Sequence, residues 1–234
     1  MRGIDGVDAV IAPPFPFLIP VSGAIGRVQL GAQDAWPGDT GAMTGAVSAG
    51  ELKEIGVTHV IVGHSERRIH AGETDEMIAK KLHAVLVNGL NAVLCVGERE
   101  RSGDGAPEAA CNQLRSAIRG MPSEFLAGLI VAYEPVWAIS TTLGASPDTP
   151  ENASRAAASL RSVIALLYSP EAADAMVIIY GGSVNADNAA EFLREGDVGG
   201  VLVGGASLHP GGFLQIVRHA SSIFKFKGKT KNEK

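Results

Sequence analysis

The feature that most constrains the fold is a regular alternation of short β-branched runs with longer amphipathic or alanine-rich runs. The short runs predict strands at residues 7–12, 27–33, 59–63, 92–96, 129–133, 176–180 and 200–203. The runs between them predict helices at residues 17–25, 49–55, 73–88, 107–119, 150–168, 186–194 and 212–224. Strands that alternate with helices form βα units around a parallel sheet. The sequence therefore predicts an α/β protein.

The number of predicted βα units narrows the architecture. Eight parallel strands close into a (β/α)8 barrel, whereas seven leave unpaired backbone on the first and last strands. We expect a barrel of this type with seven readable units.

Two stretches break the alternation of predicted strands and helices. Residues 35–47 are glycine-rich and aperiodic, which predicts a long excursion outside the barrel, and residues 138–149 have the small residues of a mobile lid. Neither resembles a linker, so residues 1–234 are expected to form one domain.

Composition favours a compact cytoplasmic protein. Hydrophobic residues make up 46% of the chain and charged residues 19%, no apolar run reaches the length of a membrane span, and the start lacks the core of a signal peptide. The net charge is −5; residues 224–234 carry five lysines and one glutamate, or +4, which leaves −9 for residues 1–223. An acidic body argues against nucleic acid as a partner. We expect the lysine-rich tail to be a solvated, frayed end, with a docking segment as the alternative.

Cys95 and Cys111 lack metal-ligand spacing and are expected to be reduced thiols.

Two residues at the ends of predicted strands could carry chemistry. Glu134 follows the strand at 129–133 and precedes Pro135, so this carboxylate lies where a strand gives way to a loop. His64 follows the strand at 59–63 and puts an imidazole at the same level. Since a serine and a glutamate follow it, the histidine also fits a capped turn with a purely structural role. Parallel barrels keep their chemistry at this end of the strands.

Glycine pairs follow the last two predicted strands. They occur in Gly181-Gly182-Ser183 and in Gly204-Gly205. Glycines let backbone N–H groups approach an anion closely, and the last loops of such barrels are places where phosphate binds, although tight turns use the same residues. A carboxylate, an imidazole and a phosphate cradle on one rim indicate proton transfer on a small phosphorylated compound. The carboxylate would take the proton and the imidazole would polarise the adjacent carbonyl.

Eight segments, in order and over essentially the whole chain, resemble the triosephosphate isomerase family. The most specific are Gly63-His64-Ser65-Glu66-Arg67-Arg68 and Tyr133-Glu134-Pro135-Val136-Trp137. The segments lie at residues 31–33, 41–45, 62–68, 72–76, 95–98, 132–139, 180–184 and 203–208. The resemblance implies a TIM barrel and an isomerase of glycolysis and gluconeogenesis. Its reaction interconverts D-glyceraldehyde 3-phosphate and dihydroxyacetone phosphate through an enediolate.

The resemblance also implies a role for individual residues. Glu134 would be the proton-shuttling base and His64 the neutral electrophile, and Glu66, beside His64 in the same motif, would be a third catalytic residue. Residues 135–138 would be the hinge of the lid. The phosphate-binding and dimer-loop positions would be Ser140, Ser183, Gly204, Gly205 and Thr44. No metal or organic cofactor is implied, and the partners would be a three-carbon phosphorylated substrate and further copies of the chain.

Two departures from the family pattern lead to alternatives. Family members carry an asparagine and a lysine after a first strand, but the first such residues here are Asn88 and Lys53. Residues 140–142 read Ser-Thr-Thr where the family has Gly-Thr-Gly, which reduces the freedom of the lid to close. The first βα unit would lie upstream, be supplied by a separate chain, or be replaced by oligomerisation over the open edge. The alternative function is a weak or inactive barrel that binds phosphorylated ligands.

Overall fold

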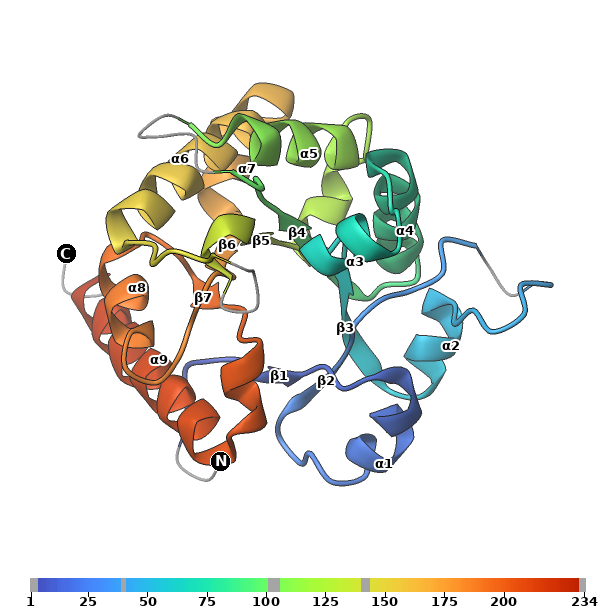
Figure 1. Ribbon diagram of the computed structural model, residues 1–234, viewed down its shortest axis with the longest axis horizontal. Coiled ribbons are helices and arrows are strands. Elements are labelled where there is room, and N and C mark those ends of the chain that lie inside the picture. Colours follow the sequence, from blue (N-terminus) through green and yellow to red (C-terminus); the bar gives the residue numbers. More distant parts are fainter. Residues whose placement is uncertain (1–3, 39–40, 101–105, 140–143, 232–234) are drawn as a thin grey trace.

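The computed structural model describes residues 4–38, 41–100, 106–139 and 144–231, with side chains up to Lys225. Seven parallel strands form one sheet in chain order, and the sheet curls into a barrel surrounded by helices (Figure 1). The strands are β1 (Val10–Ile11), β2 (Gln29–Ala32), β3 (Val57–Val62), β4 (Asn91–Val96), β5 (Leu129–Tyr133), β6 (Val177–Tyr180) and β7 (Gly200–Val201). Among the described residues no pairing joins β7 to β1. The predicted parallel α/β barrel with seven strands is confirmed.

The helices follow the predicted pattern with three differences. The α-helices are α1 (Leu18–Ser22), α2 (Ala49–Glu54), α3 (Ser65–His70), α4 (Asp75–Val87), α5 (Glu108–Ile118), α6 (Pro150–Leu167), α7 (Pro170–Ala175), α8 (Ala189–Glu195) and α9 (Pro210–Lys231). Short 3-10 helices are η1 (Phe15–Phe17), η2 (Ser123–Gly128), η3 (Val136–Ala138) and η4 (Gly205–Leu208). The short helices α3 and α7 were not predicted as separate elements. None of the described helices is both long and apolar enough to cross a membrane.

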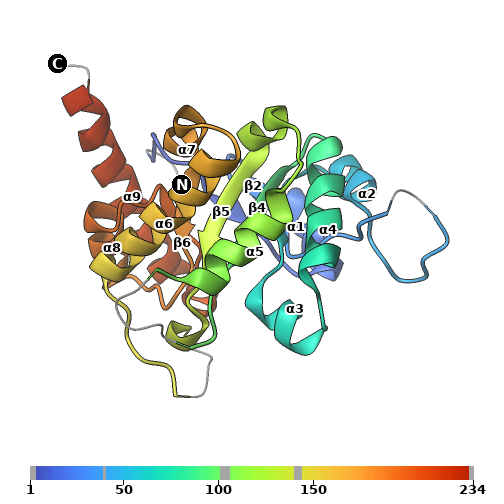
Figure 2. The same cartoon turned by 90° about the horizontal axis from the view of Figure 1, so that it is seen from above.

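The third difference is at the C-terminal end, where the tail predicted from residue 224 is helical as far as Lys231, and residues 232–234 lie outside the described residues. Helix α9 continues through Lys231 and projects from the barrel (Figure 2). Two contacts join the helix to the N-terminal segment: Ser221 Oγ donates to the Asp5 carbonyl at 2.7 Å, and Lys225 Nζ lies 3.6 Å from Asp5 Oδ2. Lysine is a good helix former, so a lysine-rich sequence prolongs a helix that packing has already started.

The core has two layers because side chains alternate along each strand. On β4, Leu94 and Val96 face the helices, whereas Val93 and Cys95 face the interior of the barrel. The interior residues pack with Ala132 of β5, with partly buried residues of β3, β5 and β6, and with Leu202 just after β7. Both cysteines are free thiols, as predicted, and burial raises the pKa of the Cys95 thiol well above its ordinary value.

The glycine-rich stretch after β2 is a long excursion outside the barrel, as predicted. The backbone N–H of Trp36 donates to the Val47 carbonyl at 2.7 Å, which closes the base of the loop. Beyond that base, residues 41–45 are exposed and point away from the sheet (Figure 2).

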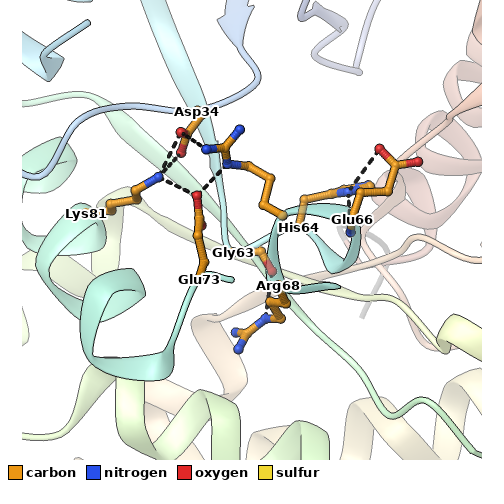
Figure 3. A network of polar contacts seen from close by, with 8 residues as sticks. Asp34, Gly63, His64, Glu66, Arg68, Glu73 and Lys81 are labelled. Atoms are coloured by element: carbon orange, nitrogen blue, oxygen red, sulfur yellow. Dashed lines mark hydrogen bonds and ion pairs between the residues drawn. The ribbon is translucent and has the colours of Figure 1, made fainter. Parts of the chain in front are cut away.

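A buried cluster of charges joins the segment after β2 to α3 and α4 (Figure 3). Lys81 Nζ lies 2.6 Å from Asp34 Oδ1 and 2.6 Å from Glu73 Oε1. Arg67 of α3 contacts both carboxylates and lies 2.8 Å from Asp34 Oδ2. Burial raises the pKa of Asp34 despite Lys81, whereas for Glu73 the hydrogen bonds from Lys81 and Arg67 outweigh burial and lower the pKa. The cluster fixes α3 against the body of the barrel.

The cluster predicts that neighbouring lysines of α4 differ in their effect on stability. Lys81→Met should lower the free energy of unfolding by about 3–5 kcal/mol, because two buried carboxylates lose the more deeply buried of the two cations that they share. Lys80→Met is the matched control, since among the described residues Lys80 forms an ion pair only with the exposed Glu76, at 2.7 Å, and its loss should change stability little. Urea denaturation of both variants measures the difference, and equal effects would show that the cluster is not stabilising.

Candidate active site

Glu134 follows β5 directly and is 2% exposed. Its backbone N–H donates to the Val96 carbonyl at 2.8 Å, which extends the β4–β5 ladder by one residue. Two glycines make room for it: a Cβ on Gly97 would lie 1.7 Å from the Glu134 carbonyl oxygen, and one on Gly181 would lie 2.8 Å from Glu134 Cγ. Any larger residue at either position would displace the carboxylate.

His64 lies opposite this carboxylate as the N-cap residue of α3. Its Nε2 atom is 3.1 Å from Glu134 Oε1, and its Nδ1 atom accepts the backbone N–H of Glu66 at 3.3 Å. Because Nδ1 accepts a hydrogen bond, the neutral ring carries its proton on Nε2 and donates it to Glu134. The backbone N–H of Ser65 donates to the other oxygen, Glu134 Oε2, at 3.3 Å. The structure therefore brings together the two residues that the sequence indicated.

The contact between these two residues sets the charge preference of the imidazole. Burial disfavours the imidazolium and lowers the pKa of His64, but the hydrogen bond and charge of Glu134, with a smaller contribution from Glu66, outweigh it. The net result is a raised pKa while the ring and the carboxylate are in contact. Glu66 contributes little because its carboxylate is 65% exposed and lies 3.9 Å from Nδ1.

A second buried carboxylate supports the loop that follows Glu134. Glu98 comes two residues after β4, and its Oε1 atom accepts the Tyr133 hydroxyl at 2.7 Å and Trp137 Nε1 at 2.9 Å. Burial and the nearby Glu98 charge raise the pKa of Tyr133, so this hydroxyl remains a donor. Glu98 is not among the residues predicted from the sequence, although a carboxylate two residues after a strand is the same kind of signal that identified Glu134.

The predicted phosphate loops lie beside each other because β6 and β7 are paired. Ile179 is opposite Gly200, and Tyr180 is opposite Val201. Ser183 is partly exposed in the loop after β6, and Gly204 and Gly205 are exposed at the start of η4. The loop after β6 also contacts the end of β5, since the Gly181 N–H donates to the Tyr133 carbonyl at 2.8 Å. Three of the four predicted phosphate positions thus share one rim, and Ser140 lies outside the described residues.

The remaining predicted residue, Thr44, lies apart from the site. It is exposed in the excursion after β2, and its role at a subunit contact stays a prediction.

A cavity of about 200 Å³ lies behind the Glu134 carboxylate, between α3 and α5, with Ser65, Arg68, Gln113 and Glu134 among its lining residues. In the described part of the chain no three histidine, cysteine or acidic side chains are grouped to hold a metal ion.

The fold and this arrangement define an α/β barrel with a paired imidazole and carboxylate and two glycine loops at the carboxyl ends of its strands. Residues 2–220 match the family model described as triosephosphate isomerase. A triosephosphate isomerase of Herpetosiphon aurantiacus is 43% identical over 215 residues, which are 90% of this chain and 85% of that protein. That of Vibrio cholerae is 41% identical over 231 residues, 96% of this chain and 88% of the relative. The chain belongs to the triosephosphate isomerase family.

The contact between Glu134 and His64 predicts a change in titration that does not depend on turnover. Glu134→Gln should lower the pKa of His64, because the group that raises it is lost while the ring stays buried. Glu66→Gln is the control and should lower it less. NMR titration of the ¹⁵N-labelled imidazole measures both values. An unchanged pKa in Glu134→Gln would mean that the two side chains are not in contact in solution.

Proposed function

We propose that the chain is a triose-phosphate isomerase that interconverts D-glyceraldehyde 3-phosphate and dihydroxyacetone phosphate. The observation that carries the proposal is the 3.1 Å contact between His64 Nε2 and Glu134 Oε1. This pair lies at the ends of β3 and β5, beside the glycine loops that follow β6 and β7. The names of the family model and of the relatives agree with this substrate class.

In this proposal Glu134 moves one proton between adjacent carbons. The carboxylate takes a proton from the carbon next to the substrate carbonyl, which leaves an enediolate, and returns it to the other carbon. Its burial favours this role, because a carboxylate removed from bulk water exchanges protons with substrate rather than with solvent. The Ser65 N–H and the glycines at 97 and 181 hold the carboxylate at the strand ends.

His64 polarises the carbonyl through Nε2–H. A substrate bound between the ring and the carboxylate separates the two groups, so the interaction that raises the pKa of His64 is removed. Burial remains and favours the neutral ring. The Glu66 N–H still occupies Nδ1, so the single ring proton stays on Nε2 and points to the substrate. The neutral imidazole then donates a hydrogen bond to the oxygen on which negative charge develops.

Ser183, Gly204 and Gly205 bind the phosphate in this proposal. A Cβ on either glycine would meet nothing within 4 Å, so both backbone segments have open space beside them. The positive end of the peptide dipoles at η4 adds to the attraction for an anion.

No described lysine side chain is available to the substrate, because each one contacts another residue of the chain. The pairs are Lys53 with Asn88, Lys80 with Glu76, Lys81 with Asp34 and Glu73, and Lys225 with Asp5. Among the described residues, His64 is the group placed to stabilise the enediolate.

The role of Glu134 is tested by turnover in a coupled spectrophotometric assay. Glu134→Gln should lower kcat by about 10²- to 10⁴-fold, because it removes the general base, and should change KM far less. Glu124→Gln, at an exposed carboxylate of η2, is the control with unchanged kcat. A folded chain without turnover, or a Glu134→Gln variant as active as the control, would refute the proposal.

Phosphate binding is tested separately from turnover. Inorganic phosphate should raise the melting temperature of the chain in a concentration-dependent manner, since it binds the folded state alone. Ser183→Ala should weaken this shift, whereas Ser162→Ala, at an exposed serine of α6, should not. Differential scanning fluorimetry at constant ionic strength measures the shifts. Stabilisation without turnover would favour a ligand-binding barrel instead of an enzyme.

A further inference from the structure

Arg68 of α3 connects three elements through one planar group. Its Nε atom donates to the Gly63 carbonyl at 2.8 Å, and its Nη2 atom donates to the Cys95 carbonyl at 3.4 Å. Its Nη1 atom pairs with the Asp75 carboxylate in the first turn of α4. The side chain is only 14% exposed and extends away from the Asp34–Lys81 cluster (Figure 3). The end of β3, the end of β4 and the start of α4 therefore share one guanidinium.

The first of these contacts acts on the backbone of His64. The Gly63 carbonyl belongs to the peptide group that leads into His64, so a hydrogen bond to this oxygen fixes the plane of that group. Together with the backbone torsions of His64, the orientation of this plane sets the direction in which the imidazole leaves the chain and the direction of the next N–H. That next N–H is the Ser65 donor to Glu134 Oε2.

The second contact acts on the strand beside Glu134. Cys95 lies in β4, opposite Ala132 in the register with β5, and two residues before Gly97, against which the Glu134 backbone packs. A shift of the β4 end relative to β3 would change the distance between the imidazole and the carboxylate. Arg68 opposes that shift because it holds a carbonyl of each strand.

The neighbouring Arg67 makes different contacts. The two arginines therefore allow the positioning of the site to be distinguished from the stability of the fold. Arg67 points to the Asp34–Glu73–Lys81 cluster and contacts neither strand-end carbonyl. Helix α3 has only six residues, and a helix this short is not stable by itself, so it depends on such side-chain contacts. Arg67 anchors one side of α3 to the body of the barrel, and Arg68 anchors the other side to the site.

We infer that Arg68 is a positioning residue for the His64–Glu134 pair, an assignment that rests on the proposed function. Arg68 also lines the cavity of about 200 Å³ that lies behind Glu134 and Ser65. If the contacts of Arg68 are lost, this cavity leaves room for the segment of His64 and Ser65 to move. A lysine cannot replace the guanidinium, because one ammonium cannot direct donors to two carbonyls and a carboxylate in fixed directions.

The experiment compares Arg68→Lys with Arg67→Lys, a matched pair on the same helix. Arg68→Lys should lower kcat by about 10- to 100-fold, the effect expected when catalytic groups are displaced by about 1 Å, with KM changed by less than about threefold. Arg67→Lys should lower the urea midpoint at least as much but keep kcat within about twofold. Guanidinium chloride at low millimolar concentration should partly restore kcat in Arg68→Ala, because the vacated space accepts the ion. Equal kcat losses in both lysine variants, or no restoration, would overturn the inference.

A second measurement does not need turnover. In ¹H–¹⁵N spectra the Ser65 amide and the His64 ring resonances should move in Arg68→Lys and in Asp75→Asn, which removes the counter-ion of Arg68, but not in Arg67→Lys. If the unaltered chain shows no turnover, the proposed function fails and these spectra still decide the positioning role. Unmoved resonances in both Arg68→Lys and Asp75→Asn would refute it.

Discussion

The site depends on the parallel register of three adjacent strands. Val62 of β3 is opposite Leu94 of β4, and Val96 of β4 is opposite Tyr133 of β5. This register places the residues after β3 and β5 at one level, so that an imidazole and a carboxylate meet across the end of β4. A slip of one residue would turn every side chain of a strand to the other face of the sheet. The two-layered core prevents that slip, because Val93 and Leu94 face different layers that are both already filled.

The sequence predicted the parts of this structure that depend on local pattern. The run at 129–133 is an apolar, β-branched strand, and β5 has the predicted limits. Glu134 and His64 could be found because each follows such a run. Helices α3 and α7 were missed because each shares a connection between two strands with a longer helix, α4 or α6, and only the longer helix shows a clear helical period.

Other features could not be predicted because they arise only in three dimensions. Glu98 meets Tyr133 and Trp137 through the pairing of β4 with β5, and the sequence spacing between them contains no sign of it. The charged cluster could not be predicted for the same reason, since Asp34 and Lys81 are far apart along the chain. Arg68 was part of a recognised motif, yet its contacts with two strand ends depend on where a short helix packs.

The small size of α3 has a consequence for the way in which this protein loses activity. Its six residues carry the imidazole and the Ser65 donor, but they contribute little apolar surface to the core, where Ser65 is the only buried residue of the helix. Segments with few apolar contacts open at lower free energy than the strands to which they are attached. Reversible opening of this segment would abolish the His64–Glu134 contact while the sheet stays folded. Heat inactivation would then begin as a local event, and amide hydrogen exchange in α3 would be faster than exchange in β4 and β5.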